Sequence, residues 1–273
     1  MPSGAMGMSF QDTLAVRRLS PRHPLRWLRA GWNDFLRSWP VGLAHGAAVV
    51  LFAVALLLVA GEKFWLLAGA FSGFLLVAPV VATGLYAVSR ELGAGRPAGF
   101  RTVIDAWMSW RGEPRHDWRL VVFGCLLCLA GTGWVLTSAA LITALSPEPI
   151  NSPTDFLWHV VVSRDHYLFE LWMALGGLLA APVFASSVIT LPLLLDRQVT
   201  VLEAVIASWH AVIRNPGVMA LWASLIAVLS LAGIALLLVG CLVAVPVLGH
   251  ASWHAYRDTL DASTLPGRTL GRG

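Results

Sequence analysis

Three histidines are the residues whose type and spacing come closest to a chemical site. His250 and His254 stand four positions apart near the end of the last apolar stretch, so a helix places them on one face. His45 enters the first apolar stretch at a similar depth. Three imidazoles at one depth could bind heme iron, copper or zinc. We favour the alternative, in which they are amphipathic anchors or bond to backbone freed by Pro246.

Other polar groups indicate a lined interior rather than a reaction centre. The residues that could line a cavity are Ser72, Thr83, Tyr86, Ser186 and Thr190. The CLLC pair, Cys125 and Cys128, has redox or metal spacing, but in an apolar helix it is typical of small packing residues. The loop 145–166 carries acids and histidines without metal-ligand spacing. No phosphate loop, GxSxG or HExxH motif occurs. We therefore predict no catalytic residues, no enzyme activity and no cofactor.

The elements that must position these groups are membrane helices. Hydrophobic residues make up 57% of the 273-residue chain and charged residues only 12%, whereas soluble domains carry about 25% charged residues. The mean hydropathy is +0.72. These values exclude a soluble enzyme of the usual kind, a disordered chain and a disulfide scaffold, and nothing indicates a nucleic-acid partner. The composition predicts an all-α, polytopic membrane bundle.

Apolar runs of about 20 residues predict six transmembrane helices. The expected spans are about 41–60, 64–89, 119–144, 167–194, 217–233 and 234–257. The last two divide a 217–257 stretch that is too long for one crossing, with a reversal near Gly233. Residues 20–258 then form the membrane domain, and we expect 1–19 and 259–273 to be flexible cytoplasmic tails.

The distribution of charge orients this bundle. All 19 basic residues except Lys63 and Arg164 fall on one predicted side. The positive-inside rule therefore puts both termini in the cytoplasm. Amphipathic segments on that side should lie in the headgroup plane and bind anionic lipid. One predicted apolar face joins Val201, Val205, Trp209 and Val212.

No acid or base is predicted at mid-membrane, because every Asp, Glu, Lys and Arg sits near a span end. Ion-coupled carriers and proton pumps keep such a group in the bilayer interior. This distribution argues against ion-coupled transport and leaves a passive pathway or a lipid-binding cavity open.

A threefold internal repeat accounts for several conspicuous residues. Each unit would run from an interfacial helix through Trp and Pro to a span, a reversal and a second, Pro-containing span that ends in a charged pair. The alternative is that any basic-flanked helical hairpin has this pattern. The residues assigned to structural roles are Trp32, Trp107, Trp209, Pro79, Pro246, Arg90, Arg197 and Arg257.

The segments PVLGHASWHAYRD at 246–258 and SGFLLVAPVVATGLYAVSREL at 72–92, with RNP at 214–216, resemble one bacterial family. It comprises predicted integral membrane proteins and is called domain of unknown function 2189. The resemblance covers roughly residues 20–260 and implies topology rather than an activity. Some members are labelled as cytochrome c oxidase subunits, which implies at most an accessory or assembly role. A single lysine among the basic residues is typical of a GC-rich bacterial gene and indicates an inner membrane.

Three functional hypotheses follow from these patterns. The leading one is a non-enzymatic accessory or scaffold protein of another membrane complex, which could be respiratory. The alternative is a passive transport, permeation or lipid-binding protein. The third is a heme or metal binder that uses His45, His250 and His254.

Overall fold

A computed structural model describes residues 15–60, 80–109, 118–163 and 167–268, and these are almost entirely helical. The elements are β1 (Ala15–Val16), α2 (His23–Arg37), α3 (Trp39–Ala60), α5 (Thr83–Gly93), α6 (Phe100–Trp107), α7 (Arg119–Leu145), α8 (Pro153–Asp155), η2 (Phe156–Val162), α9 (Leu168–Ser187), α10 (Thr190–Asp196), α11 (Val201–Arg214), α12 (Pro216–Ala235), α13 (Cys241–Thr259) and β2 (Leu260–Asp261). The all-α class expected from the composition is confirmed.

Four helices in the described ranges are long and apolar enough to cross a membrane. They are Trp39–Leu58, Arg119–Leu145, Leu168–Asp196 and Pro216–Ala235. These match the first, third, fourth and fifth predicted spans within a few residues. Most of the second predicted span, 64–89, lies outside the described residues, as do Ser72 and Pro79.

The stretch 217–257 is two helices, but the reversal falls at 236–240 rather than at Gly233. Leu237 and Leu238 adopt positive φ angles there. Gly233 instead ends up against Gly240, where a side chain on either would clash with the other's backbone. The glycine predicted to make the turn therefore permits the close approach of the two helices that the turn joins.

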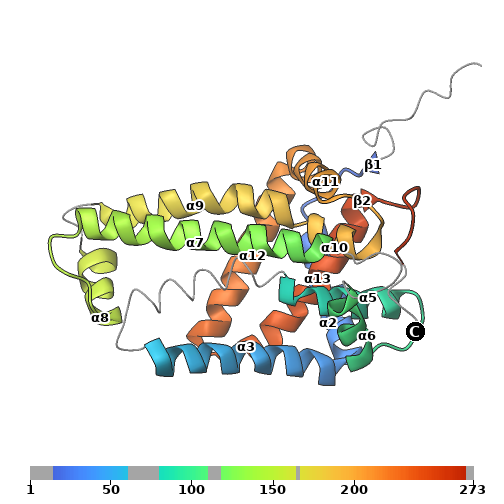
Figure 1. Cartoon of the computed structure of the whole chain (residues 1–273), viewed down its shortest axis with the longest axis horizontal. Helices are drawn as coiled ribbons and strands as arrows, with labels where there is room; N and C mark the ends of the chain where they lie inside the picture. The colour runs from blue at the N-terminus through green and yellow to red at the C-terminus, as the bar shows by residue number, and fades with distance from the viewer. Residues whose placement is uncertain (1–14, 61–79, 110–117, 164–166, 269–273) are drawn as a thin grey trace, which may run out of the picture.

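The short helices gather at one end of the molecule, and the long apolar helices extend from it (Figure 1). α2, α5, α6, α10 and α11 lie at the right in this view, whereas α8 and η2 lie at the far left. The structure thus separates a helix-rich end, which holds most charged residues, from a long apolar body.

Helix α13 forms the centre of the helix-rich end, and this explains why it is not among the four apolar spans. α2, α3, α5 and α12 all pack against it. His250, Ala251, Ala255 and Tyr256 are fully buried within the chain. A helix surrounded by its own protein can carry histidines and charges that a lipid-facing span cannot. The sixth predicted span therefore differs from the four apolar spans, because its C-terminal part, α13, is enclosed by the protein's own helices.

Three amphipathic helices at this end each expose an apolar stripe. The exposed residues are Leu25, Trp32, Leu36 and Trp39 on α2 and just after it, Phe100, Ile104 and Trp107 on α6, and Leu202, Trp209 and Ile213 on α11. The predicted face of α11 was partly wrong, because Val205 and Val212 pack on the core and Leu202 and Ile213 are exposed. Exposed apolar stripes on amphipathic helices are typical of elements that lie in the headgroup plane.

The ends of the described chain are tied together, contrary to the flexible tail expected from 259. β1 pairs with β2 in antiparallel register, with Ala15 opposite Asp261. Beyond it, residues 262–268 lie against α10, and Arg268 is buried. Its backbone N–H donates to the carbonyl oxygen of Asp196 at 2.9 Å. The tail is therefore packed as far as Arg268, because its polar groups find partners on α10.

Candidate functional site

His250 and His254 share one face of α13, as predicted, and each meets a different polar partner. His250 is fully buried, with its Nδ1 2.8 Å from Ser89 Oγ on α5 and its Nε2 3.5 Å from Ser38 Oγ. His254 Nε2 lies 2.8 Å from the Oδ2 atom of Asp34 on α2. These contacts join three helices through one polar cluster inside an otherwise apolar core.

Asp34 is the charged member of this cluster. Burial raises the pKa of its carboxyl group, but hydrogen bonds from His254 and Ser89 outweigh that effect, so the pKa lies below the ordinary 3.8. A second polar contact joins the same helices, because the Trp27 indole N–H donates to Asp258 at 2.9 Å. The cluster therefore fastens α2 to α13.

We expect Asp34→Ala to lower the free energy of unfolding by about 1.5–3 kcal/mol, the cost of a hydrogen bond to a charged group. Because the pKa is depressed in the fold, this contribution is present at neutral pH and is lost as pH falls through the folded pKa, below the ordinary 3.8. Unfolding in mixed detergent micelles between pH 7 and pH 3 measures the difference between variant and wild type. A difference that does not shrink with acid would contradict this assignment, and Asp105→Ala, at an exposed pair with Arg101, is the control.

His45 has a different environment. Its Nδ1 lies 3.0 Å from the carbonyl oxygen of Val41, so Nδ1 carries the proton and donates. Its Nε2 is buried and has no hydrogen-bond partner among the residues that the structure describes. The ring lies beside Trp107, with centroids 5.5 Å apart. Within the described residues, the lone pair of His45 Nε2 is therefore an acceptor without a donor, which is rare for a buried side chain.

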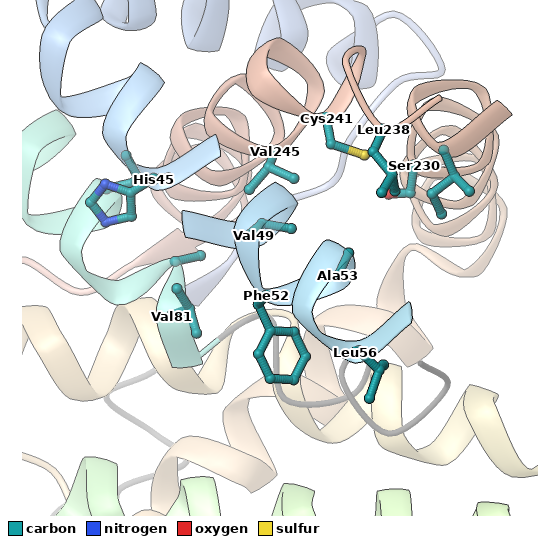
Figure 2. Close-up of a pocket in the computed structure, with 13 residues that line it drawn as sticks. His45, Val49, Phe52, Ala53, Leu56, Val81, Ser230, Leu238, Cys241 and Val245 are labelled. Atoms are coloured by element: carbon teal, nitrogen blue, oxygen red, sulfur yellow. The ribbon is translucent and has the colours of Figure 1, made fainter. Parts of the chain in front are cut away.

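His45 stands at one end of an apolar pocket between α3, the start of α5, and the α12–α13 reversal (Figure 2). The pocket is small, with a cavity volume of about 90 Å³, below the roughly 300–1,000 Å³ of ordinary small-molecule sites. Its lining is otherwise apolar except for Ser230 and the thiol of Cys241. The structure thus combines an apolar cavity with one unpaired acceptor.

The three histidines proposed as metal or heme ligands are not brought together as one donor set. Within the described ranges no group of three or more His, Cys, Asp and Glu is placed to hold a metal ion. His250 and His254, four residues apart on α13, bond to different partners, Ser89 and Asp34. His45 lies apart from them at the edge of the pocket. The geometry favours the structural alternative for His250 and His254.

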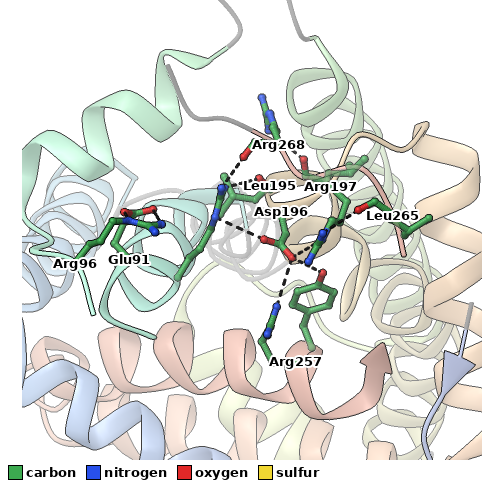
Figure 3. Close-up of polar contacts among 11 residues, drawn as sticks. Glu91, Arg96, Leu195, Asp196, Arg197, Arg257, Leu265 and Arg268 are labelled. Carbon is green, nitrogen blue, oxygen red and sulfur yellow. Dashed lines mark hydrogen bonds and ion pairs between the residues drawn. The ribbon is translucent and has the colours of Figure 1, made fainter. Parts of the chain in front are cut away.

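A second polar cluster surrounds Asp196 at the end of α10 (Figure 3). Its carboxylate accepts a hydrogen bond from Tyr256 Oη at 2.8 Å. Three guanidinium groups surround it: Arg197 at 3.0 Å, Arg90 at 3.6 Å and Arg257 at 3.8 Å. The charged ends of all three predicted repeat units therefore meet at one carboxylate.

The arginines of this cluster also hold the C-terminal tail. Arg90 donates to the carbonyl oxygens of Leu195 and Arg268, and Arg197 donates to that of Leu265 at 2.8 Å. Arg268 in turn donates to the Leu194 carbonyl oxygen and to Ser109 Oγ. Most of these donors are engaged with backbone, so the cluster fixes the arrangement of α5, α10, α13 and the tail.

The hydroxyl residues predicted to line an interior do not share a cavity. Thr83 and Thr190 donate to carbonyl oxygens one turn earlier, those of Val80 and Ser186. Ser186 Oγ accepts from the indole N–H of Trp209 at 2.9 Å. Tyr86 is buried in the core. Thr83 and Thr190 thus bond to the preceding turn, Ser186 bonds to α11, and Thr83 also lines a separate cavity beside Trp107 and Ser109.

The remaining sequence candidates also have structural environments. Cys125 and Cys128 are free and exposed on α7. In the far loop, Asp155 accepts from the backbone N–H groups of Asn151 and Ser152 and so caps α8. Trp32, Trp107 and Trp209 are all about half exposed, at comparable places on three amphipathic helices.

The sequence did not single out four residues of these polar clusters, namely Asp34, Ser38, Ser89 and Arg268. On α2, Trp27, Gly31, Asp34 and Ser38 are spaced by three or four residues and form its buried face. That spacing marks a helix face, and it was obscured by the more conspicuous apolar stripe on the other side. Nothing in the sequence indicated that Arg268 would be buried.

A groove runs between α7 and α9, on the apolar body. Its cavity volume is about 490 Å³. Its lining includes small residues and one hydroxyl, with aromatic and aliphatic side chains around them: Ala130, Gly133, Thr137, Gly176, Gly177, Ala180, Trp134, Trp172, Met173, Leu179 and Val183. Small residues on membrane helices permit close approach of another helix backbone.

A sequence model of the family described as "Predicted integral membrane protein (DUF2189)" matches residues 66–196. The match covers 131 of the 273 residues, just under half of the chain. The match runs from the second predicted span to Asp196, and so includes α5, α6, α7 and α9. This match confirms the resemblance to an integral membrane family over residues 66–196, whereas the segments 214–216 and 246–258 lie outside it. Neither the curated proteins nor the solved structures contain a match to the chain.

Proposed function

We propose that this protein is a non-enzymatic accessory protein that binds another membrane complex through the α7–α9 groove. The observation that carries the proposal is that groove, with Gly133, Gly176 and Gly177 in its lining. A partner surface within a bilayer must be helical, since unpaired backbone is not tolerated in lipid. The occupant we propose is accordingly a transmembrane helix of a second protein.

The apolar helices have surface available for such a partner. Only 22% of the most apolar window of α7 is buried by this chain. Two clusters of buried polar groups, at Asp196 and at His250, by contrast hold helices together. This division supports a role carried by the membrane surface of the protein, without catalysis, cofactor or nucleic acid. That the partner complex is respiratory is a part of the proposal that comes only from the labels of family members.

The topology we propose has six spans with both termini in the cytoplasm of a bacterial inner membrane. The pairing of β1 with β2 supports an even number of crossings, because it puts Ala15 and Asp261 on one side. The convergence of Arg90, Arg197 and Arg257 at Asp196 supports three related units whose ends share that side. Basic interfacial helices there would bind anionic headgroups.

Passive permeation receives less support than accessory binding. A pathway needs polar groups past mid-membrane, and the pocket beside α3 is apolar apart from His45, Ser230 and Cys241. The hydroxyl groups of Thr83 and Thr190 are engaged by their own helices.

A substitution that fills the α7–α9 groove tests the proposal. We expect Gly177→Leu to reduce copurification of a membrane protein partner at least tenfold, because its side chain would occupy the helix contact. Leu178→Phe, at a 70% exposed neighbour, is the matched control. The measurement is quantitative mass spectrometry after mild solubilisation of native membranes, with a cysteine at Gly133 for cross-linking.

Equal recovery of every partner with both variants would overturn the proposal. Cross-links only between copies of this chain would replace it with self-association, and cross-links only to lipid probes would show that lipid fills the groove.

A further inference from the structure

We infer that α2, alone among the three amphipathic helices, is a docking surface for anionic phospholipid, with its arginines against the lipid phosphates. The inference narrows the headgroup binding proposed above to one helix, and it requires only that the helix-rich end lies at a membrane surface. It rests on three features of α2: the arrangement of residues around its axis, its fixed orientation, and its excess of positive charge.

Three sectors follow one another around α2, because successive residues of a helix are turned by about 100°. The buried sector comprises Pro24, Trp27, Gly31, Asp34 and Phe35. The exposed apolar sector comprises Leu25, Trp32 and Leu36. The exposed basic sector adjoins it and comprises Arg26, Arg29 and Arg37, with Arg22 just before the helix. An apolar sector flanked by arginines is the pattern of a helix that inserts between acyl chains while its cations stay among the phosphates.

The packing of α2 on α13 fixes which sectors face outward. Gly31 lies so close to α13 that a Cβ atom there would be 2.6 Å from the carbonyl oxygen of Val247. The indole N–H of Trp27 donates to Asp258 of the same helix at 2.9 Å. α2 therefore cannot roll about its axis, and it presents both exposed sectors to its surroundings without rearrangement.

The connection to α3 places α2 at the edge of the bilayer. Ser38 has the non-helical backbone angles φ −130° and ψ 31°, and it separates α2 from α3. α3 is one of the four apolar spans and begins at Trp39, an exposed residue of the type that is enriched at membrane interfaces. A helix that is joined through one residue to a transmembrane span ends at the bilayer surface.

Charge distinguishes α2 from the other two amphipathic helices. α2 contains three arginines and one aspartate, and that aspartate is buried. α6 contains one arginine and one aspartate, Arg101 and Asp105, which pair with each other. α11 contains Glu203 and Arg214, so it has no excess of either sign at neutral pH. All three helices expose apolar residues, but among them α2 has the excess positive charge that attracts anionic headgroups.

Two arginines of the basic sector are the main phosphate ligands. Arg26 and Arg37 lie 3.6 Å and 3.9 Å from acidic side chains of α13 and of α2 itself, so their charge is partly matched within the protein. For Arg22 and Arg29, which are both exposed, the residues that the structure describes provide no ion pair. A guanidinium group binds phosphate oxygens through two parallel hydrogen bonds. These two side chains are therefore the ones to remove.

The test uses the full-length protein in nanodiscs of phosphatidylcholine and phosphatidylglycerol, one of which carries a diazirine near the glycerol end of an acyl chain. Mass spectrometry maps the labelled residues. The phosphatidylglycerol probe should label α2 about fivefold or more above the phosphatidylcholine probe, the ratio for one basic residue near an anionic surface, whereas α6 and α11 should show equal labelling. Arg22→Gln combined with Arg29→Gln should remove most of this preference. Arg101→Gln, at the exposed pair on α6, is the control and should leave it unchanged.

The apolar sector has its own readout. Trp32→Gln combined with Leu36→Gln should reduce labelling of α2 by both probes alike, because it removes apolar contacts and keeps the charge. Equal labelling of wild-type α2 by the two probes, or the same preference on α6 and α11, would overturn the inference, provided that size-exclusion profiles show folded protein. Labelling of α7 without any labelling of α2 would overturn it as well. Both leaflets contain both lipids, so the result is independent of the orientation of the termini and of the α7–α9 groove.

Discussion

Replacing Asp196 by alanine should destabilise this protein more than any other single change at a polar residue. The side chain is almost fully buried and is shared by Arg90, Arg197, Arg257 and the Tyr256 hydroxyl. Its removal leaves guanidinium groups and a hydroxyl without their common acceptor. Breaking a buried charge pair by deleting one partner costs about 3–5 kcal/mol.

Two further variants separate charge from hydrogen bonding at this cluster. Asp196→Asn retains an oxygen that can accept from Tyr256 but loses attraction to the arginines, so it should fall between wild type and alanine. Tyr256→Phe removes only the 2.8 Å hydrogen bond to the carboxylate and should cost about 1.5–3 kcal/mol, as for other hydrogen bonds to a charged group. Unfolding in mixed micelles measures all three. If Asp196→Ala costs no more than Asp105→Ala, the cluster does not hold these helices together.

Replacing both Gly31 and Gly46 by alanine should lower the free energy of unfolding about as much as Asp196→Ala does. A Cβ at Gly31 would lie 2.6 Å from the carbonyl oxygen of Val247 on α13, and one at Gly46 would lie 2.5 Å from that of Leu242. Backbone atoms cannot rotate away as a side chain does, so α2 and α3 must move. Overpacking of this kind costs about 1–3 kcal/mol for each site, and the two contacts should be roughly additive.

Gly217→Ala is the matched control, because nothing lies within 4 Å of a Cβ at that position. Alanine is the better helix former, so this variant should be neutral or slightly stabilising. Unfolding in mixed micelles compares the variants. If Gly217→Ala lowers the free energy of unfolding as much as Gly31→Ala does, the effect of these substitutions comes from lost backbone freedom and not from helix contacts.

Much of the helical framework was predictable, because it depends on local composition. Apolar runs of bilayer length predicted four helices that the structure contains within a few residues. The Asp196–Arg197 pair and its counterparts at Arg90 and Arg257 were recognised as span ends. Their meeting point was not predictable, because it depends on which helix ends become neighbours in space.

Predictions that required contacts were less accurate. His250 and His254 were placed correctly on one helix face, but Ser89 and Asp34 come from other helices and set their roles. His45 was grouped with them by depth, whereas the packing of α3 against α5 and α13 places it at a separate pocket. The tail expected to be flexible is packed because α10 offers backbone partners to Arg268.

The sequence by itself determined the class of this protein and the sorting of its charges, since hydropathy and basic residues act through local transfer free energies. Only the tertiary structure decided that α13 is enclosed by its own chain and that one carboxylate joins three helix ends. It also decided that the Nε2 atom of His45, beside an apolar pocket, has no hydrogen-bond partner among the described residues. These features depend on which surfaces meet, and residues far apart in sequence meet only after the helices pack.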